Sequence, residues 1–364
     1  MSLIADALRE RPVLRGALIA PSVAALIFSL FTLTAAPDPA TLASGVTIAT
    51  VNHDAGLPFP PINMASRLID GLDARLPMHL RAFDSDEAAR AALDAETVQA
   101  VLIFPEDFSR AVAGTEAVPL TLITSGSLTM AEAQLTGALP GMVESGVSAA
   151  VQSIRLAMAR GQMPDMTPPV ALTAEALNPP TTAAARVAPF VAGFATALAA
   201  LVGGILGWVG TRGLGGVRGA ALRTLFPVIA LPVAALVLAG LVAGFAGGAF
   251  GALWLAIALL GVAFGWFFAG ALALFGPLAL LVLVPLAFWQ PAIGGGQMPL
   301  SAAPEWLHWL APLHLDAIGG YFRALILGAG HDFPWSLALG AAALGLAMIW
   351  LRAALVRRPA PVAA

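Results

Sequence analysis

Long stretches without charged residues alternate along this chain with a single large polar block. Four stretches are free of charge, and they contain 22, 25, 81 and 19 residues. An ionised side chain at the centre of a bilayer costs at least ~2.5 kcal/mol, and a helix needs roughly 20 residues to cross, so each stretch can hold at least one membrane span. They cover residues 16–37, 187–211, 224–304 and 333–351.

The 81-residue stretch is too long for one helix and contains glycine and proline breakpoints. These lie at Gly247-Gly248, at Gly276-Pro277 and at Gln290-Pro291, and they predict three helices. The sequence therefore predicts six transmembrane helices, at 16–34, 187–210, 225–246, 252–274, 278–289 and 335–351. The first could instead be a cleaved signal peptide, but its apolar run exceeds the usual length of about 7 to 15 residues, which favours a retained helix.

The placement of arginine predicts the orientation. Segments 1–15, 211–224 and 352–364 hold three Arg each, which predicts that they are cytoplasmic. Residues 37–185 hold 16 acidic residues and 7 Arg, a net charge of −9, whereas the rest of the chain has a net charge of +6. We therefore expect residues 37–185 to be translocated across the membrane.

Within residues 37–185, runs rich in β-branched residues alternate with helical patterns, which predicts an α/β domain. Asp84 followed by Glu87 predicts a helix-capping box, and Pro105 predicts a helix start. Apolar positions from Leu135 to Met158 predict a long amphipathic helix bent near Pro140, whose apolar stripe suits a packed core or, alternatively, a ligand groove. We expect strands at 46–51, 78–83, 100–104 and 120–124 in a mainly parallel sheet, helices at 62–76, 84–95, from 105 and at 130–160, and an irregular segment at 161–185.

The predicted fold class is an α-helical membrane protein with six transmembrane helices and an inserted extracytoplasmic α/β domain. Its expected parts are a cytoplasmic amphipathic segment 1–15, transmembrane helix 1 at 16–36, the α/β domain at 37–185, helices 2–6 with a re-entrant hairpin near 292–330 within 186–356, and a cytoplasmic tail at 357–364.

Composition removes several kinds of chemistry. The chain is 59% hydrophobic and 11% charged, with a mean hydropathy of +0.86, and it has neither Lys nor Cys. A Walker A lysine, a Schiff-base lysine, a cysteine nucleophile and a thiolate metal site are therefore excluded. No predicted span holds an Asp, Glu or His that could bind a coupling ion, so energy for transport would come from another polypeptide. We expect no enzyme activity, no cofactor and no metal in this chain alone, and no nucleic-acid partner.

The segment 290–333 is broken by glycine and proline into pieces too short to span. It predicts a hairpin that dips into the outer leaflet, with tryptophan at the interface. Glu305, His308, His314 and Asp316 within it could form a metal site, or simply the polar face of that hairpin. The hairpin residues are Gly294, Gly295, Gly296, Pro299, Pro304, Trp306, Pro312 and Arg323.

Glycine pairs four residues apart recur in the predicted spans. They allow helices to approach closely, within one subunit or between two. The pairs are Gly203 with Gly207, Gly240 with Gly244, Gly247 with Gly251, and Gly261 with Gly265.

Three motifs together resemble the ABC-2 type permease family, and within it the YhgE/Pip-like branch with a large domain after the first helix. One is Val51-Asn52-His53-Asp54-Ala55-Gly56, similar to that branch's V-N-x-D-x-G opening. Another is the apolar run 100–104 followed by Pro105-Glu106-Asp107-Phe108-Ser109, which is close to its P-E-D-F-S element. The third is the hairpin segment through Pro299, Trp306 and Arg323 before the last helix.

The resemblance implies a permease subunit of an ATP-driven exporter in the bacterial cytoplasmic membrane, with both termini cytoplasmic and an outward-moving hydrophobic or amphipathic substrate. It implies a second permease subunit, a homodimer in the simplest case, membrane lipid around it, and ABC ATPase subunits that bind ATP and Mg²⁺. The first cytoplasmic loop would dock on the ATPase, with Arg212, Arg218 and Arg223 as candidate coupling residues. Alternatively, these three arginines serve only the positive-inside bias.

A second functional hypothesis comes from the α/β domain. Its size and its net charge of −9 are also compatible with a membrane-anchored accessory protein or receptor that binds a secreted protein or a phage.

Overall fold

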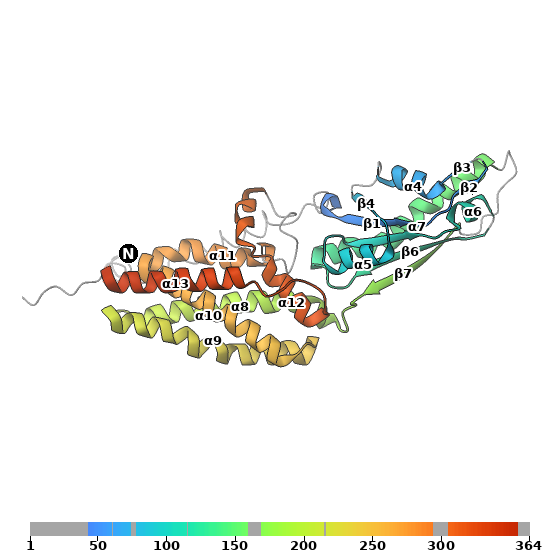
Figure 1. Cartoon of the computed structure of the whole chain (residues 1–364). Coiled ribbons are helices and arrows are strands. Elements are labelled where there is room, and N and C mark those ends of the chain that lie inside the picture. Colours follow the sequence, from blue (N-terminus) through green and yellow to red (C-terminus); the bar gives the residue numbers. More distant parts are fainter. Residues whose placement is uncertain are drawn as a thin grey trace, which may run out of the picture.

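The structure is a computed structural model that describes residues 43–59, 61–73, 78–114, 116–158, 169–214, 216–293 and 305–355. An α/β domain lies at one end of a bundle of long helices (Figure 1). The chain passes directly from the last strand of the domain, β7 (Val170–Leu177), into the first described helix of the bundle, α8 (Ala183–Gly210).

Five strands form the sheet of the α/β domain, in the order β4-β1-β5-β6-β7. β1 pairs in parallel with β4 and β5, β6 is antiparallel to β5, and β7 is parallel to β6. The bounds are β1 Thr47–Asn52, β4 His79–Phe83, β5 Ala100–Phe104 and β6 Val118–Ser125, with a separate two-stranded ribbon of β2 Leu57–Pro58 and β3 Pro61–Ile62.

The expected mainly parallel sheet is confirmed, except that β5 and β6 are antiparallel. One expectation is wrong, because the segment 161–185 is not wholly irregular and contains β7. The antiparallel pair arises because α6 (Phe108–Ala113), between β5 and β6, has only six residues. At ~1.5 Å per residue such a helix is too short to carry the chain back along the sheet to begin a parallel strand.

Helices cover both faces of the sheet. One face packs against α4 (Met64–Asp73), α6 and α7 (Met130–Met158), and the other packs against α5 (Asp86–Asp94). The long α7 contains Pro140, as expected, and its apolar stripe is packed core, with Leu139, Val143, Val147 and Val151 buried.

Two predicted helix starts in this domain are wrong by one to three residues. Ser85, rather than Asp84, is the N-cap of α5, and its hydroxyl oxygen accepts from the backbone N–H of Ala88 at 3.2 Å. Pro105 does not begin a helix, because α6 begins at Phe108 after a turn in which the Phe108 N–H donates to the Pro105 carbonyl.

Among the residues that the structure describes, four stretches of the bundle are long and apolar enough to cross a membrane, at Ala183–Gly210, Gly216–Ala246, Phe250–Ala287 and Trp335–Leu355. These stretches indicate a membrane protein. The expected first span, 16–34, lies outside the described residues. The third stretch contains two of the expected helices, α10 and α11, which are separated by the short helix η1 at Gly276. The bounds are α9 Gly216–Ala246, α10 Phe250–Phe275, η1 Gly276–Ala279, α11 Leu280–Ile293, η3 Glu305–Leu313, α12 Ala317–Leu327 and α13 Trp335–Leu355.

Close helix packing in the bundle depends on glycine. A Cβ at Gly270 of α10 would collide with the backbone of Gly345 on α13, and one at Gly345 would collide with the backbone at Trp266 and Phe267. Helices α9 and α10 are joined by two indole hydrogen bonds, from Trp254 to the Pro232 carbonyl at 3.0 Å and from Trp266 to the Thr224 carbonyl at 2.8 Å.

Candidate functional site: an apolar pocket in the helix bundle

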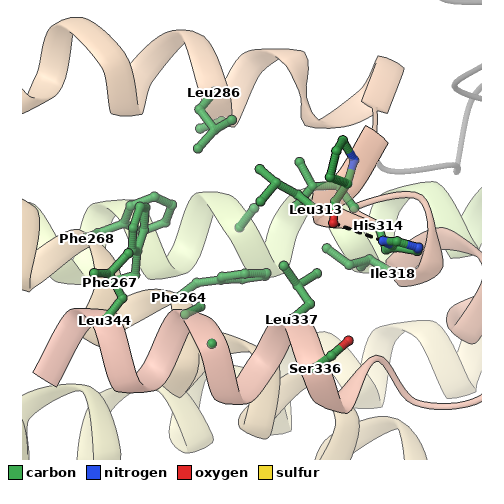
Figure 2. A pocket seen from close by; sticks show the side chains of 16 residues that line it. Phe264, Phe267, Phe268, Leu286, Leu313, His314, Ile318, Ser336, Leu337 and Leu344 are labelled. Carbon is green, nitrogen blue, oxygen red and sulfur yellow. Dashed lines mark hydrogen bonds between the residues drawn. The ribbon is translucent and has the colours of Figure 1, made fainter. Parts of the chain in front are cut away.

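A pocket of about 420 Å³ lies among the helices of the bundle. Helices α8, α10, α11, α12 and α13 and the segment η3 all contribute to its lining (Figure 2). Its volume lies within the range of about 300–1,000 Å³ that is typical of small-molecule sites. The lining residues are Ala197, Phe264, Phe267, Phe268, Leu286, Ala287, Pro312, Leu313, His314, Leu315, Ile318, Ser336, Leu337, Gly340, Ala341 and Leu344.

The pocket has an aromatic region and a more polar region. Phe264, Phe267 and Phe268 come from successive turns of α10, with ring centroids 5.7 Å apart for Phe267 and Phe268. Figure 2 shows His314 and Ser336 away from these rings, at the other side of the pocket. The His314 ring is fixed by a 3.1 Å contact between Nδ1 and the Pro312 carbonyl oxygen. A molecule with a long apolar part and a small polar group would match this arrangement.

Charged residues are confined to the ends of the long helices. Helices α10 and α11 contain none, and in α8, α9 and α13 the charged residues are Arg186, Arg218, Arg223 and Arg352, all within a few residues of a helix end. The turn between α8 and α9 and the end of α13 therefore place Arg212, Arg218, Arg223 and Arg352 at the end of the bundle opposite the α/β domain.

The three candidate coupling arginines have different surroundings. Arg223 is half-buried and holds the turn, because its Nε donates to the Thr211 hydroxyl at 2.9 Å and its Nη2 donates to the Thr211 carbonyl at 3.2 Å. Arg212 stacks over the Trp208 ring at 3.8 Å. Arg212 and Arg218 are both exposed, but the Arg212 guanidinium already stacks on Trp208, so Arg218 is better placed to meet a partner.

The motif residues of the α/β domain form a buried hydrogen-bond network around Asp54. Asp54 accepts from the Ser109 hydroxyl at 2.5 Å and from the N–H groups of Ser109, Gly56 and Ala65 at 2.9, 3.1 and 3.3 Å. Burial alone would raise the pKa of Asp54, but these hydrogen bonds outweigh it and hold the pKa below its ordinary value. This hydrogen-bond network joins the start of α4 to the start of α6.

The remaining motif residues support the same hydrogen-bond network. The Asn52 side chain accepts from the Asp54 N–H at 2.9 Å, and the Glu106 carbonyl accepts from the Ala55 N–H at 3.0 Å. Gly56 has φ +75°, a conformation that L side chains rarely adopt. Phe108 is buried edge-to-face on Phe104, Pro105 is half-buried, and the side chains of Glu106 and Asp107 are exposed. The two motifs are thus brought together by the fold in a structural arrangement.

The predicted hairpin is described only from Glu305 onward. Gly294, Gly295, Gly296, Pro299 and Pro304 lie outside the described residues. Trp306 and Pro312 are exposed on η3, whereas Arg323 is buried on α12. Within the described part of the chain, no three His, Asp or Glu residues are grouped as a metal site would require, so Glu305, His308, His314 and Asp316 do not form one there.

Of the four predicted glycine pairs, two lie against neighbouring helices. A Cβ at Gly265 would approach Leu231 Cδ1 to 2.5 Å and one at Gly207 would approach Phe226 to 3.2 Å, whereas Gly203 and Gly261 have ordinary contacts at 3.5 and 3.6 Å. The pairs Gly240 with Gly244 and Gly247 with Gly251 do not mark close helix contacts. Sequence reasoning missed other close contacts with helix backbone, at Gly204, Gly270 and Gly345.

Sequence reasoning also missed a buried polar cluster where the α/β domain meets α12. Arg323 pairs with Glu96 at 2.6 Å, and Glu132 is buried nearby. Thr129 and Glu132 have the sequence spacing of a capping box, which made Glu132 detectable. In the structure, the side chain of each residue accepts a hydrogen bond from the backbone N–H of the other. The Glu96–Arg323 pair gives no local signal, since 227 residues separate its members.

Comparisons with known proteins give little further information. No protein-family model and no curated protein matches the chain. One solved structure is similar, a domain assigned to an ABC type-2 transporter from Thermotoga maritima, with 18% sequence identity. The match covers 36% of this chain and 84% of that domain with a TM-score of 0.27, a score too low to support an inference about fold or function.

Proposed function

We propose that this chain is the membrane-spanning permease subunit of an ABC-2 type exporter. Its substrate would be hydrophobic or amphipathic, and the energy would come from ATP and Mg²⁺ bound by a separate ATPase subunit. The observation that carries the proposal is the apolar pocket of about 420 Å³ enclosed by long helices whose charged residues lie only at their ends. Such a bundle can accept apolar cargo, and the described spans offer no acidic side chain for ion coupling.

The proposed orientation follows from the two ends of the bundle. The arginine-bearing end with Arg212, Arg218, Arg223 and Arg352 would be cytoplasmic, and the α/β domain at the other end would be extracytoplasmic. A second copy of the chain would complete the transport path, as the family resemblance implies.

Arg218 offers the sharpest test of ATPase docking. Its side chain is exposed on the turn that would face the ATPase, whereas Arg212 and Arg223 already contact Trp208 and Thr211. We expect Arg218→Glu to reduce co-purification of the partner ATPase and substrate-stimulated ATP hydrolysis in proteoliposomes.

Arg352→Glu is the matched control, because it makes the same charge change at the same end of the bundle but on α13. Unchanged co-purification with Arg218→Glu would count against docking at this turn. Absence of both efflux and stimulated hydrolysis in wild-type proteoliposomes containing the ATPase would refute the permease function itself.

The receptor function remains a second proposal, favoured by one feature of the domain surface. Phe59, in the β2–β3 ribbon, is 92% exposed, and an exposed aromatic side chain at a hairpin tip can anchor a protein partner. If this function is correct, Phe59→Ser should abolish capture of a secreted partner by the full-length protein while leaving efflux unchanged. Capture that is equal for wild type and Phe59→Ser would remove the support for this function.

A further inference from the structure

The α/β domain and helix α12 are joined by a buried, two-armed ion pair. Arg323 donates from Nε to Glu96 Oε1 at 3.0 Å and from Nη2 to Glu96 Oε2 at 2.6 Å. The exposed fractions of the two side chains are 6% and 10%. Two parallel N–H···O bonds fix the orientation of the partners as well as their separation, so this contact resists rotation of α12 relative to the domain.

Further charged groups surround the pair. The buried carboxyl of Glu132, at the start of α7, is near enough to Arg323 to be affected by its charge, and His331 Nε2 lies 3.7 Å from Glu96 Oε2. Burial raises the pKa of Glu132, hydrogen bonds from Thr129 and the charge of Arg323 lower it, and the charge of Glu96 raises it, with a net upward shift. Glu96 itself has φ +55°, an uncommon conformation for a residue other than glycine. Such a conformation persists where the surroundings hold it.

Helix α12 connects this ion pair to the pocket. Ile318 lines the pocket five residues before Arg323, a distance of ~7.5 Å along the helix axis. With 11 residues, α12 is too short to be stable as an isolated helix. Its position therefore depends on its contacts, which include Ile318 and Phe322 in the apolar core of the bundle and Arg323 at the domain.

We propose that the Glu96–Arg323 ion pair is the joint through which the α/β domain sets the position of α12 and thereby the wall of the apolar pocket. Glu96 and Arg323 are positioning residues, and Ile318 is the residue of α12 that lines the pocket. A partner or ligand that shifts the α/β domain would change access to the pocket through this joint.

A thiol reporter at Ile318 tests this joint directly, because the native chain contains no Cys. Ile318 is 2% exposed, so the thiol in Ile318→Cys should react slowly with a maleimide in the full-length protein in nanodiscs. Adding Glu96→Gln removes the carboxylate of the two-armed ion pair and should loosen the attachment of α12 to the domain. We expect the labelling rate to rise at least about fivefold, the lower end of usual couplings between sites.

Glu175→Gln is the matched control in the same reporter background. It removes the carboxylate of another two-armed pair, Arg90 on α5 with Glu175 on β7 at 3.2 and 3.0 Å, which is exposed on the α/β domain. We expect this change to leave the labelling rate at Ile318→Cys unaltered. Equal rates with Glu96→Gln and Glu175→Gln would overturn the proposal.

A second reporter separates release of α12 from unfolding of the domain. Val147 is fully buried in the domain core on α7, and labelling of Val147→Cys should stay slow when Glu96→Gln is added. If both reporters become reactive together, the domain has unfolded and the joint is rejected. These measurements need neither ATPase nor substrate, so their failure would leave the permease proposal untouched.

Discussion

The close crossing of α10 and α13 gives a prediction that can be worked out atom by atom. A Cβ added at Gly345 would overlap the backbone of Trp266 and Phe267, and backbone atoms cannot rotate away as a side chain does. Gly345→Ala must therefore push the two helices apart. Separation would also loosen the packing of the fully buried Ile349 on α13.

The expected cost combines two opposing effects. Overpacking of a tight interior typically destabilises by about 1–3 kcal/mol. Replacing a helical glycine by alanine contributes up to about 1 kcal/mol in the other direction. Because the collision is with backbone, we expect Gly345→Ala to lower the free energy of unfolding by about 1–2 kcal/mol overall.

Gly340→Ala on the same helix is the matched control. Nothing lies within 4 Å of the position that its Cβ would occupy, so we expect unchanged or slightly higher stability. Reversible unfolding by a denaturing detergent, followed by tryptophan fluorescence, measures both variants. Gly270→Ala should resemble Gly345→Ala, and the double variant should cost less than the sum, since both remove one contact. Equal stability of Gly345→Ala and Gly340→Ala would show that the two helices do not approach this closely.

Three further predictions concern the α/β domain and use unfolding of the full-length protein. Asp54→Asn replaces one acceptor oxygen with a donor that faces Ser109 or its neighbours, and it should lower the free energy of unfolding by about 2–4 kcal/mol. Because the folded pKa of Asp54 lies below the ordinary 3.8, this difference in stability between wild type and variant should be complete above pH 3.8 and disappear as the pH falls through the folded pKa. Glu132→Gln keeps an acceptor for both Thr129 hydrogen bonds and removes a buried carboxyl group whose pKa is raised. Stability near neutral pH should therefore be maintained or increased. A clear loss of stability would mean that the carboxylate is ionised at that pH. Val147→Ala should cost about 2 kcal/mol through lost burial and a cavity, and a near-zero effect would contradict a packed stripe on α7.

Patterns within one element were predictable from the sequence. The absence of charge identified helices α8, α9, α10, α11 and α13 of the bundle, and the three- to four-residue spacing from Leu135 to Met158 identified α7, because burial of one helix face leaves that signature. The first residues of helices were less predictable than the presence of the helices. Asp84 and Ser85 are both good caps, and the choice between them depends on the geometry at the end of β4.

Features that depend on distant partners could not be predicted. β7 has alternating apolar residues but a largely exposed surface, and its strand conformation depends on pairing with β6 across the whole of α7. The pocket and the Glu96–Arg323 pair likewise arise where segments far apart in the chain meet. The motif around Asp54 and Ser109 was visible as a resemblance, but its hydrogen bonds required the fold.

The two indole hydrogen bonds between α9 and α10 limit how the bundle can rearrange. If either helix slid by one turn, the N–H groups of Trp254 and Trp266 would leave their carbonyl acceptors, and within a membrane water could not replace them. Each lost bond would cost several kcal/mol in that environment. We therefore expect helices α9 and α10 to move as one body in any rearrangement of the bundle.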